Sequence, residues 1–226
     1  MSVLERSGRA GRAARRAAES GSGPVAGDAE PQRNPGARNW FGLLGEVLTV
    51  GILVTLASVP LVTLPAALAA GVRHMRRFLR AEESTFALAW NDFKAAFVGG
   101  IGVAVATAAL VLVLLLDIDL ANSGALPGGS LIAVVGWVGL AALGVALFTA
   151  AGLWSPQVRW RGALRAVPAA VRSDLPGALY LVATGVFATV VTWQLVPLIV
   201  PALGCVVLAV VAIPQRPRRR TADEQR

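Results

Sequence analysis

Four long segments of the chain carry almost no charged side chains. They cover residues 41–72, 93–116, 131–154 and 175–213. Glu46 and Lys94 are the only Asp, Glu, Lys, Arg or His residues within them. About 20 apolar residues in an α-helix cross the roughly 30 Å hydrocarbon core of a membrane, so each segment can span it at least once. We therefore predict an all-α fold, a polytopic transmembrane helical bundle in contact with the lipid bilayer.

The composition supports this class of protein. Of the 226 residues, 55 % are hydrophobic and 15 % are charged, whereas soluble domains carry about 25 % charged residues. Cys205 is the only cysteine and His74 the only histidine, so neither an intramolecular disulfide nor a metal site rich in these residues is expected. No nucleophile, base and acid stand together in the sequence. We predict no catalytic residues, no metal, no cofactor and no enzymatic activity.

The segment lengths predict six spans and leave five open. The second and third segments fit one span each, and the fourth fits two that turn at Pro197 and Pro201. The first has 32 residues, too many for one span and few for two. Pro60 and Pro65 favour a hairpin there, because each removes a helical N–H donor. The predicted spans are 41–58, 62–79, 95–116, 131–154, 176–194 and 197–213.

The distribution of basic residues also favours six spans. The chain has 21 Lys and Arg residues and a net charge of +8. Six spans with both termini on one side place all 21 on that side, and the loop 117–130 on the other side carries only Asp117 and Asp119. Cytoplasmic loops are enriched in Lys and Arg, so both termini are predicted to be cytoplasmic. With five spans, the Arg-rich N-terminal tail would lie outside.

Three regions are expected along the chain. Residues 1–39 form a disordered basic cytoplasmic tail, 40–214 a transmembrane helical domain, and 215–226 a second basic cytoplasmic tail. The first region lacks the hydrophobic core of a secretory signal peptide. We expect a multi-pass protein of the bacterial inner membrane. Every basic cluster flanks a span, so a nucleic-acid partner is not expected.

Glu46 is one candidate for a functional side chain inside the membrane. It lies about one turn into the first span, where a charge is unfavourable and often marks a functional residue. A ligand, proton or coupling role is one interpretation. A structural ion pair with Arg38 or Arg73 is the other.

The segment between Pro60 and Pro65 is a second candidate. A broken helix around Thr63 would offer freed backbone N–H groups to an anionic group, as in transporters. A tight turn between two spans explains the same prolines. We take Glu46 and Thr63 as the candidate intramembrane polar site, and Pro60 and Pro65 as the helix break.

Basic clusters at the ends of the spans are candidate contacts for anionic lipid head groups, or they only set the topology. The candidate lipid contacts are Arg73, Arg76, Arg77, Arg80, Arg218, Arg219 and Arg220. Small residues four apart, as at Ala96, Gly100 and Ala104, predict a face where helices pack closely. Stretches 86–97 and 160–171 have helical apolar spacing and predict amphipathic helices on the inner leaflet.

Residues 45–80 resemble the YesL-like family of small bacterial membrane proteins. The matching runs are Gly45-Glu46, Ser58-Val59-Pro60-Leu61-Val62-Thr63, Pro65-Ala66-Ala67-Leu68-Ala69-Ala70 and, later, Phe93-Lys94-Ala95-Ala96-Phe97. They resemble the family's acidic first span, its Ser-Leu-Pro-Val-Val-Thr stretch, its Pro-Ala-rich helix start and its aromatic-basic run. Gly51 stands where the family has Asn, and a glycine expected just before Pro65 is absent.

The resemblance implies a protein of undefined biochemical activity that is associated with carbohydrate uptake systems. We expect an accessory or regulatory role there, through contacts with transport permease subunits or through self-association. A small-solute transporter or channel in its own right is the alternative. The polar side chains inside the spans are mostly isolated threonines, which is few for coupled transport of a sugar.

Overall fold

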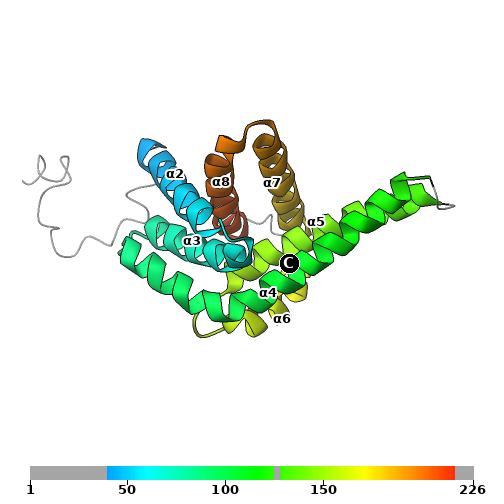
Figure 1. Cartoon of the computed structure of the whole chain (residues 1–226). Helices are drawn as coiled ribbons and strands as arrows, with labels where there is room; N and C mark the ends of the chain where they lie inside the picture. Colours follow the sequence, from blue (N-terminus) through cyan, green and yellow to red (C-terminus); the bar gives the residue numbers. More distant parts are fainter. Residues whose placement is uncertain (1–39, 125–127, 217–226) are drawn as a thin grey trace, which may run out of the picture. The chain divides into compact units, whose positions relative to one another are not determined.

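The computed structural model describes residues 40–124 and 128–216, and its regular secondary structure there is entirely helical (Figure 1). The α-helices are α2 (Trp40–Ala57), α3 (Leu64–Leu79), α4 (Phe86–Asn122), α5 (Gly129–Leu153), α6 (Arg159–Ser173), α7 (Leu175–Gln194) and α8 (Ile199–Ala212). Short 3-10 turns are η1 (Leu61–Thr63), η2 (Val196–Leu198) and η3 (Ile213–Gln215). The predicted all-α class is confirmed. The tail 1–39 and most of 215–226 lie outside the described residues.

Among the described residues, five helical segments are long and apolar enough to cross a membrane. Four are the helices α2, α4, α5 and α7, and the fifth is Val196–Gln215, which contains α8. These agree with five of the six predicted spans. The remaining predicted span, 62–79, is helix α3, which has 16 residues and a length of about 24 Å. It is therefore shorter than the hydrocarbon core, and four arginines stand at its C-terminal end.

Helix α3 is the most buried helix of the fold. Ten of its 16 residues are buried, and α2, α4, α5 and α8 all pack against it. Its first half consists largely of alanine, so neighbouring helices approach its backbone closely. A Cβ atom on Gly71 would lie 2.6 Å from Cγ2 of Val54 in α2. The core around α3 includes Val50, Val72 and Met75, which are almost fully buried.

Helices α2 and α8 cross with their backbones in contact at Gly51 and Gly204. A Cβ atom on Gly51 would fall well inside van der Waals contact with the carbonyl oxygen of Val200, and one on Gly204 would do the same with that of Val47. Any larger side chain at either position would push the two helices apart. This explains the departure at position 51, because the asparagine of the YesL-like pattern does not fit this crossing.

The two connectors predicted to be amphipathic helices differ in the structure. Residues 86–97 are the first turns of α4, which continues without a break for 37 residues or about 55 Å. Residues 160–171 lie in the separate helix α6, where Trp160 and Val167 are buried. The hairpin predicted at Pro197 is present, since α7 ends at Gln194 and α8 begins at Ile199.

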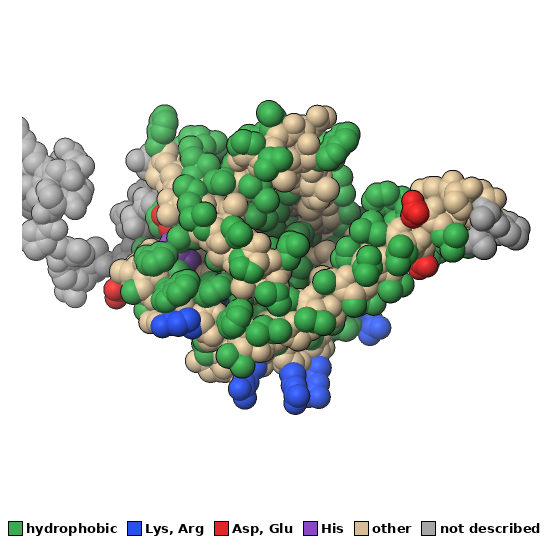
Figure 2. Space-filling view, in the orientation of Figure 1, with side chains coloured by type: hydrophobic (Ala, Val, Ile, Leu, Met, Phe, Trp, Pro, Cys, Tyr) green, Lys and Arg blue, Asp and Glu red, His purple; other side chains and the backbone are tan. Residues whose placement is uncertain are grey.

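Figure 2 shows hydrophobic side chains over most of the visible surface, with Lys and Arg side chains gathered along its lower edge. Exposed basic residues include Arg161 and Arg165 of α6. Large apolar side chains are exposed on α4 and α5, among them Leu112 at 59 % and Val135 at 62 %. Such a surface suits contact with lipid or with other membrane helices rather than with water.

We expect Gly51→Ala and Gly204→Ala to lower the stability of the protein in mild detergent by about 1–3 kcal/mol, because the added methyl group meets backbone at the crossing. Gly102→Ala is the matched control, since nothing lies within 4 Å of a Cβ atom there. Thermal unfolding followed by size-exclusion chromatography measures the effect. Equal melting of Gly51→Ala and Gly102→Ala would show that the crossing tolerates a side chain.

Candidate functional site

The polar side chains of the described region concentrate at the last turns of α3. Arg73, His74, Arg76 and Arg77 project from successive positions of this helix, and each contacts a neighbouring helix. Arg73 and Arg77 stand four residues apart on one helix face and contact α4, whereas His74 contacts α2 and Arg76 contacts α5. These contacts define the candidate functional site.

Asp92 of α4 receives two of the arginines. Its Oδ2 lies 2.6 Å from Nη2 of Arg77 and 3.1 Å from Nε of Arg73. The Asp92 residue is only 6 % exposed, and a buried carboxylate is tolerated when it is paired. The guanidinium of Arg73 also lies 5.9 Å from the ring centroid of Trp154, within cation–π range.

Asp92 was not predicted as a site residue, although its position in the sequence carries a signal. Asp92 stands four residues before Ala96 and continues the spacing through Gly100 and Ala104. All four residues are buried. A carboxylate in line with a buried small-residue face is expected to need a cationic partner, and the arginines of the preceding helix were the available candidates.

Glu46 of α2 pairs with His74 of α3. Its Oε1 lies 2.6 Å from Nε2 of His74, and the His74 side chain is 6 % exposed. Within the described residues, Glu46 therefore contacts a neighbouring helix through His74 and not through Arg73, one of the two arginines named in the structural interpretation. Arg73 contacts Asp92 instead, and Arg38 lies outside the described residues. Nδ1 of His74 is buried and has no hydrogen-bond partner among the described residues.

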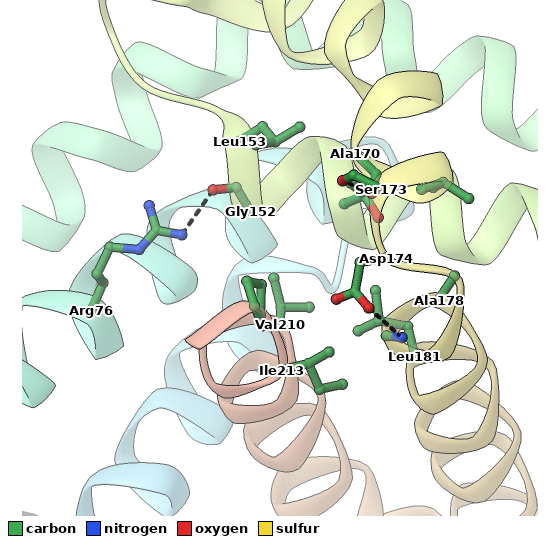
Figure 3. Close-up of a pocket in the computed structure, with 14 residues that line it drawn as sticks. Arg76, Gly152, Leu153, Ala170, Ser173, Asp174, Ala178, Leu181, Val210 and Ile213 are labelled. Carbon is green, nitrogen blue, oxygen red and sulfur yellow. Dashed lines mark hydrogen bonds between the residues drawn. The ribbon is translucent and has the colours of Figure 1, made fainter. Parts of the chain in front are cut away.

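Arg76 lines a cavity, which Figure 3 shows. Its Nη2 donates a hydrogen bond of 2.9 Å to the carbonyl oxygen of Gly152, in the last turn of α5. The cavity has a volume of about 200 Å³ and is bounded by the ends of α5, α6 and α8 and by the start of α7. Asp174, at the start of α7, lies on its wall.

Asp174 joins the start of α7 to the end of α8. It accepts a hydrogen bond of 3.0 Å from the backbone N–H of Gly177, which caps the helix. Both terminal nitrogens of Arg216 bond the same carboxylate, Nη1 at 2.9 Å. The Arg216 guanidinium lies 5.4 Å from the ring centroid of Tyr180. Arg216 was predicted only as part of the basic C-terminal tail, and Asp174 was not predicted as a site residue.

Trp160 ties α6 to α4. Its Nε1–H donates a 2.8 Å hydrogen bond to the carbonyl oxygen of Ala96, and the residue is 5 % exposed. A Cβ atom on Gly99 would lie 2.8 Å from Cδ1 of Trp160. The small-residue face predicted on this helix therefore receives an indole ring, as well as Ala66 of α3 next to Gly100.

The remaining predicted site residues lie apart from this group. Thr63 belongs to η1, where its hydroxyl lies 2.6 Å from the carbonyl oxygen of Pro60 and also contacts that of Ala57. Pro65 stands in the first turn of α3. The predicted helix break is thus a turn held by Thr63, at the opposite end of α3 from the pair that Glu46 makes with His74.

The predicted lipid contacts occupy different environments. Arg73, Arg76 and Arg77 make the internal contacts described above. Arg80 is exposed and lies 3.8 Å from Glu82. Arg218, Arg219 and Arg220 lie outside the described residues. Within the described ranges, no three His, Cys, Asp or Glu side chains group as metal ligands would.

The fold and these contacts define a multi-pass, all-helical membrane protein whose helices are joined by polar contacts at their ends. Comparison with known families matches residues 48–118 to a family described as "Protein of unknown function, DUF624". The YesL-like proteins belong to that family. The match covers α3 with most of α2 and α4. No curated protein and no solved structure matches the chain.

We expect Asp92→Asn to destabilise the protein by about 3 kcal/mol, because it leaves two arginines facing a neutral amide in a largely buried site. Asp117→Asn is the matched control, since Asp117 is exposed on the same helix. Melting temperature in detergent and the yield of monodisperse protein measure the change. If both variants melt alike, the Asp92 pair contributes nothing to stability.

Proposed function

We propose that the protein is an accessory or regulatory membrane protein that acts through contacts with other membrane proteins and neither transports solute nor catalyses a reaction itself. The observation that carries this proposal is that the charged side chains between its helices contact one another. Arg73 and Arg77 each contact Asp92, and Glu46 contacts His74. These groups join the protein's own helices and do not line a continuous polar path.

A cavity between five of the helices supports the same proposal. It has a volume of about 600 Å³ and lies between α3, α4, α5, α7 and α8. Its polar lining consists of Thr107, Thr189, Thr192 and the indole of Trp193, and no ionisable residue contributes. The hydroxyl of Thr189 donates to the carbonyl oxygen of Gly185 in its own helix. A sugar pathway would need more hydrogen-bonding groups than these.

The exposed apolar faces of α4 and α5 are the proposed contact surface. The second half of α4 and the first half of α5 expose large side chains such as Leu116, Leu131 and Val138. Packing in lipid depends on close fit between helices, and this hairpin offers a long surface for it. The link with carbohydrate uptake rests on the resemblance to the YesL-like family, and we propose sugar permease subunits as the partners.

A transporter remains the competing function, and one observation favours it. Glu46 and His74 form a titratable pair between two helices, a type of pair that proton-coupled transporters use. In the accessory role that we propose, this pair only holds α2 against α3.

We expect a photo-crosslinking amino acid at Val135, which is 62 % exposed, to form crosslinks with sugar permease subunits in native membranes. The same amino acid at Val145, which is 6 % exposed on the same helix, should give none. Mass spectrometry of the crosslinked products identifies the partner.

Purified protein in liposomes should move no labelled sugar under the same proposal. Sugar flux that Glu46→Gln abolishes would contradict the accessory role and establish the transporter. Crosslinks to lipid alone at Val135, with sugar uptake unaffected by deletion of the protein, would remove the permease as partner.

We also propose that both termini are cytoplasmic, with α3 returning the chain to that side after α2. The polar contacts support this, because they join the helix ends that the basic residues place on one side. Arg76 near the end of α3 bonds Gly152 near the end of α5, and Arg216 after α8 bonds Asp174 before α7. A third contact of this kind joins Arg77 to Asp92, near the start of α4.

Labelling with a membrane-impermeant thiol reagent tests this topology in a Cys205→Ser background. We expect Ser123→Cys to react in intact cells, and Ser22→Cys and Thr221→Cys to react only after the membrane is opened. Reaction of Ser22→Cys in intact cells would place the N-terminus outside and establish five spans.

A further inference from the structure

The cavity beside Arg76 has the size of a site for a small polar group. Its volume of about 200 Å³ lies below the roughly 300–1,000 Å³ of pockets for drug-sized ligands. It is several times the ~30 Å³ that one water occupies in the liquid. Most of its lining is apolar, with Leu181, Val210 and Ile213 among the side chains that Figure 3 labels.

Arg76 brings an uncompensated positive charge to this cavity. No carboxylate of the described residues lies within ion-pair distance of it, whereas Arg73 and Arg77 share Asp92 and Arg80 lies near Glu82. Its hydrogen bond to Gly152 uses one of the five N–H donors of a guanidinium. The other donors are available to a ligand, and a half-buried cation without a counter-ion attracts an anion.

Thr149 supplies a second donor on the same side. It lines the cavity from α5 and stands three residues before Gly152, which places both on one helix face. Its hydroxyl makes no hydrogen bond with any residue that the structure describes, in contrast to the hydroxyls of Thr184 and Thr189, which bond carbonyl oxygens of their own helix.

Across the cavity, the carboxylate of Asp174 is already bound. It receives two bonds from Arg216 and one from the backbone N–H of Gly177. Asp174 and Arg216 therefore contribute no net charge together. The lining of the cavity, with Arg216 bound to it, carries a net charge of one positive unit, supplied by Arg76.

We propose that this cavity is a binding site for a phosphate-type oxyanion, held by the guanidinium of Arg76 and the hydroxyl of Thr149. A guanidinium matches the geometry of phosphate oxygens and binds them through two parallel hydrogen bonds. The phosphate belongs either to the head group of an anionic lipid or to a free phosphate ion. The site does not depend on any partner protein, so it stands or falls separately from the proposed accessory role.

Two probes distinguish the sources. Delipidated protein in a neutral detergent is titrated with inorganic phosphate by calorimetry, and native mass spectrometry counts bound phosphatidic acid against phosphatidylcholine. Binding of phosphate assigns the free ion, and retention of phosphatidic acid without binding of phosphate assigns the lipid head group. Failure of both probes to bind the wild-type protein would overturn the proposal.

Variants locate the site. We expect Arg76→Gln to weaken binding of the active probe at least tenfold, Arg76→Lys to retain part of it, and Thr149→Val to weaken it about threefold. Arg80→Gln and Thr184→Val are matched controls on the same kinds of residue, and we expect no change in either. Loss of binding in Arg80→Gln with full binding in Arg76→Gln would place the anion on the surface cluster instead. If Arg76→Gln does not fold, unchanged binding by both Thr149→Val and Arg76→Lys overturns the proposed site.

Discussion

The basic C-terminal end of α3 can be buried among other helices only if those helices supply hydrogen-bond acceptors for its charged side chains. Three arginines and a histidine within two turns would otherwise lose hydration without compensation. Asp92 on α4, Glu46 on α2 and the Gly152 carbonyl on α5 are the acceptors present. Because each comes from a different helix, satisfying the charges of α3 also sets the positions of the helices around it. The alanine-rich first half of α3 then allows those helices to pack against its backbone.

Much of the helical layout could be predicted, because apolar runs, prolines and charge bias act locally along the chain. The proline-containing breaks at 60–65 and 197–201 were visible for that reason. The burial of α3 was not, since its length and composition fit a short span and only packing shows that it is surrounded. The partners of Glu46, Asp92 and Asp174 were missed because they depend on which helix ends meet, and hydropathy carries no information about that.

Three of the arginines predicted to contact lipid make internal contacts in the structure. A basic helix end next to a membrane can meet lipid phosphates, protein carboxylates or carbonyl groups, and the sequence shows only the cation. Arg73 and Arg77 have Asp92 in reach, while no carboxylate in the described part of the chain pairs with Arg76. The difference arises from their positions on the helix, since Arg76 faces α5 and not the start of α4. Gly51 is a similar case. A glycine is required at this position because α8 crosses there, and the sequence alone does not show that crossing.

The unbroken course of α4 has a mechanical consequence. Its first turns are held by Arg77 and its fourth turn by Trp160, while its last turns pack on α5, where Ala121 and Ile118 approach Gly129 and Gly136. From Gly100 to Asn122 the helix extends roughly 33 Å beyond the turns that Arg77 and Trp160 hold. A tilt of about 10° at the anchored end would swing the far end through roughly 6 Å, by the geometry of a rod of that length. Because α5 packs on these last turns, the two helices would move together, and a small shift where the charges meet would be magnified at the far end of this hairpin.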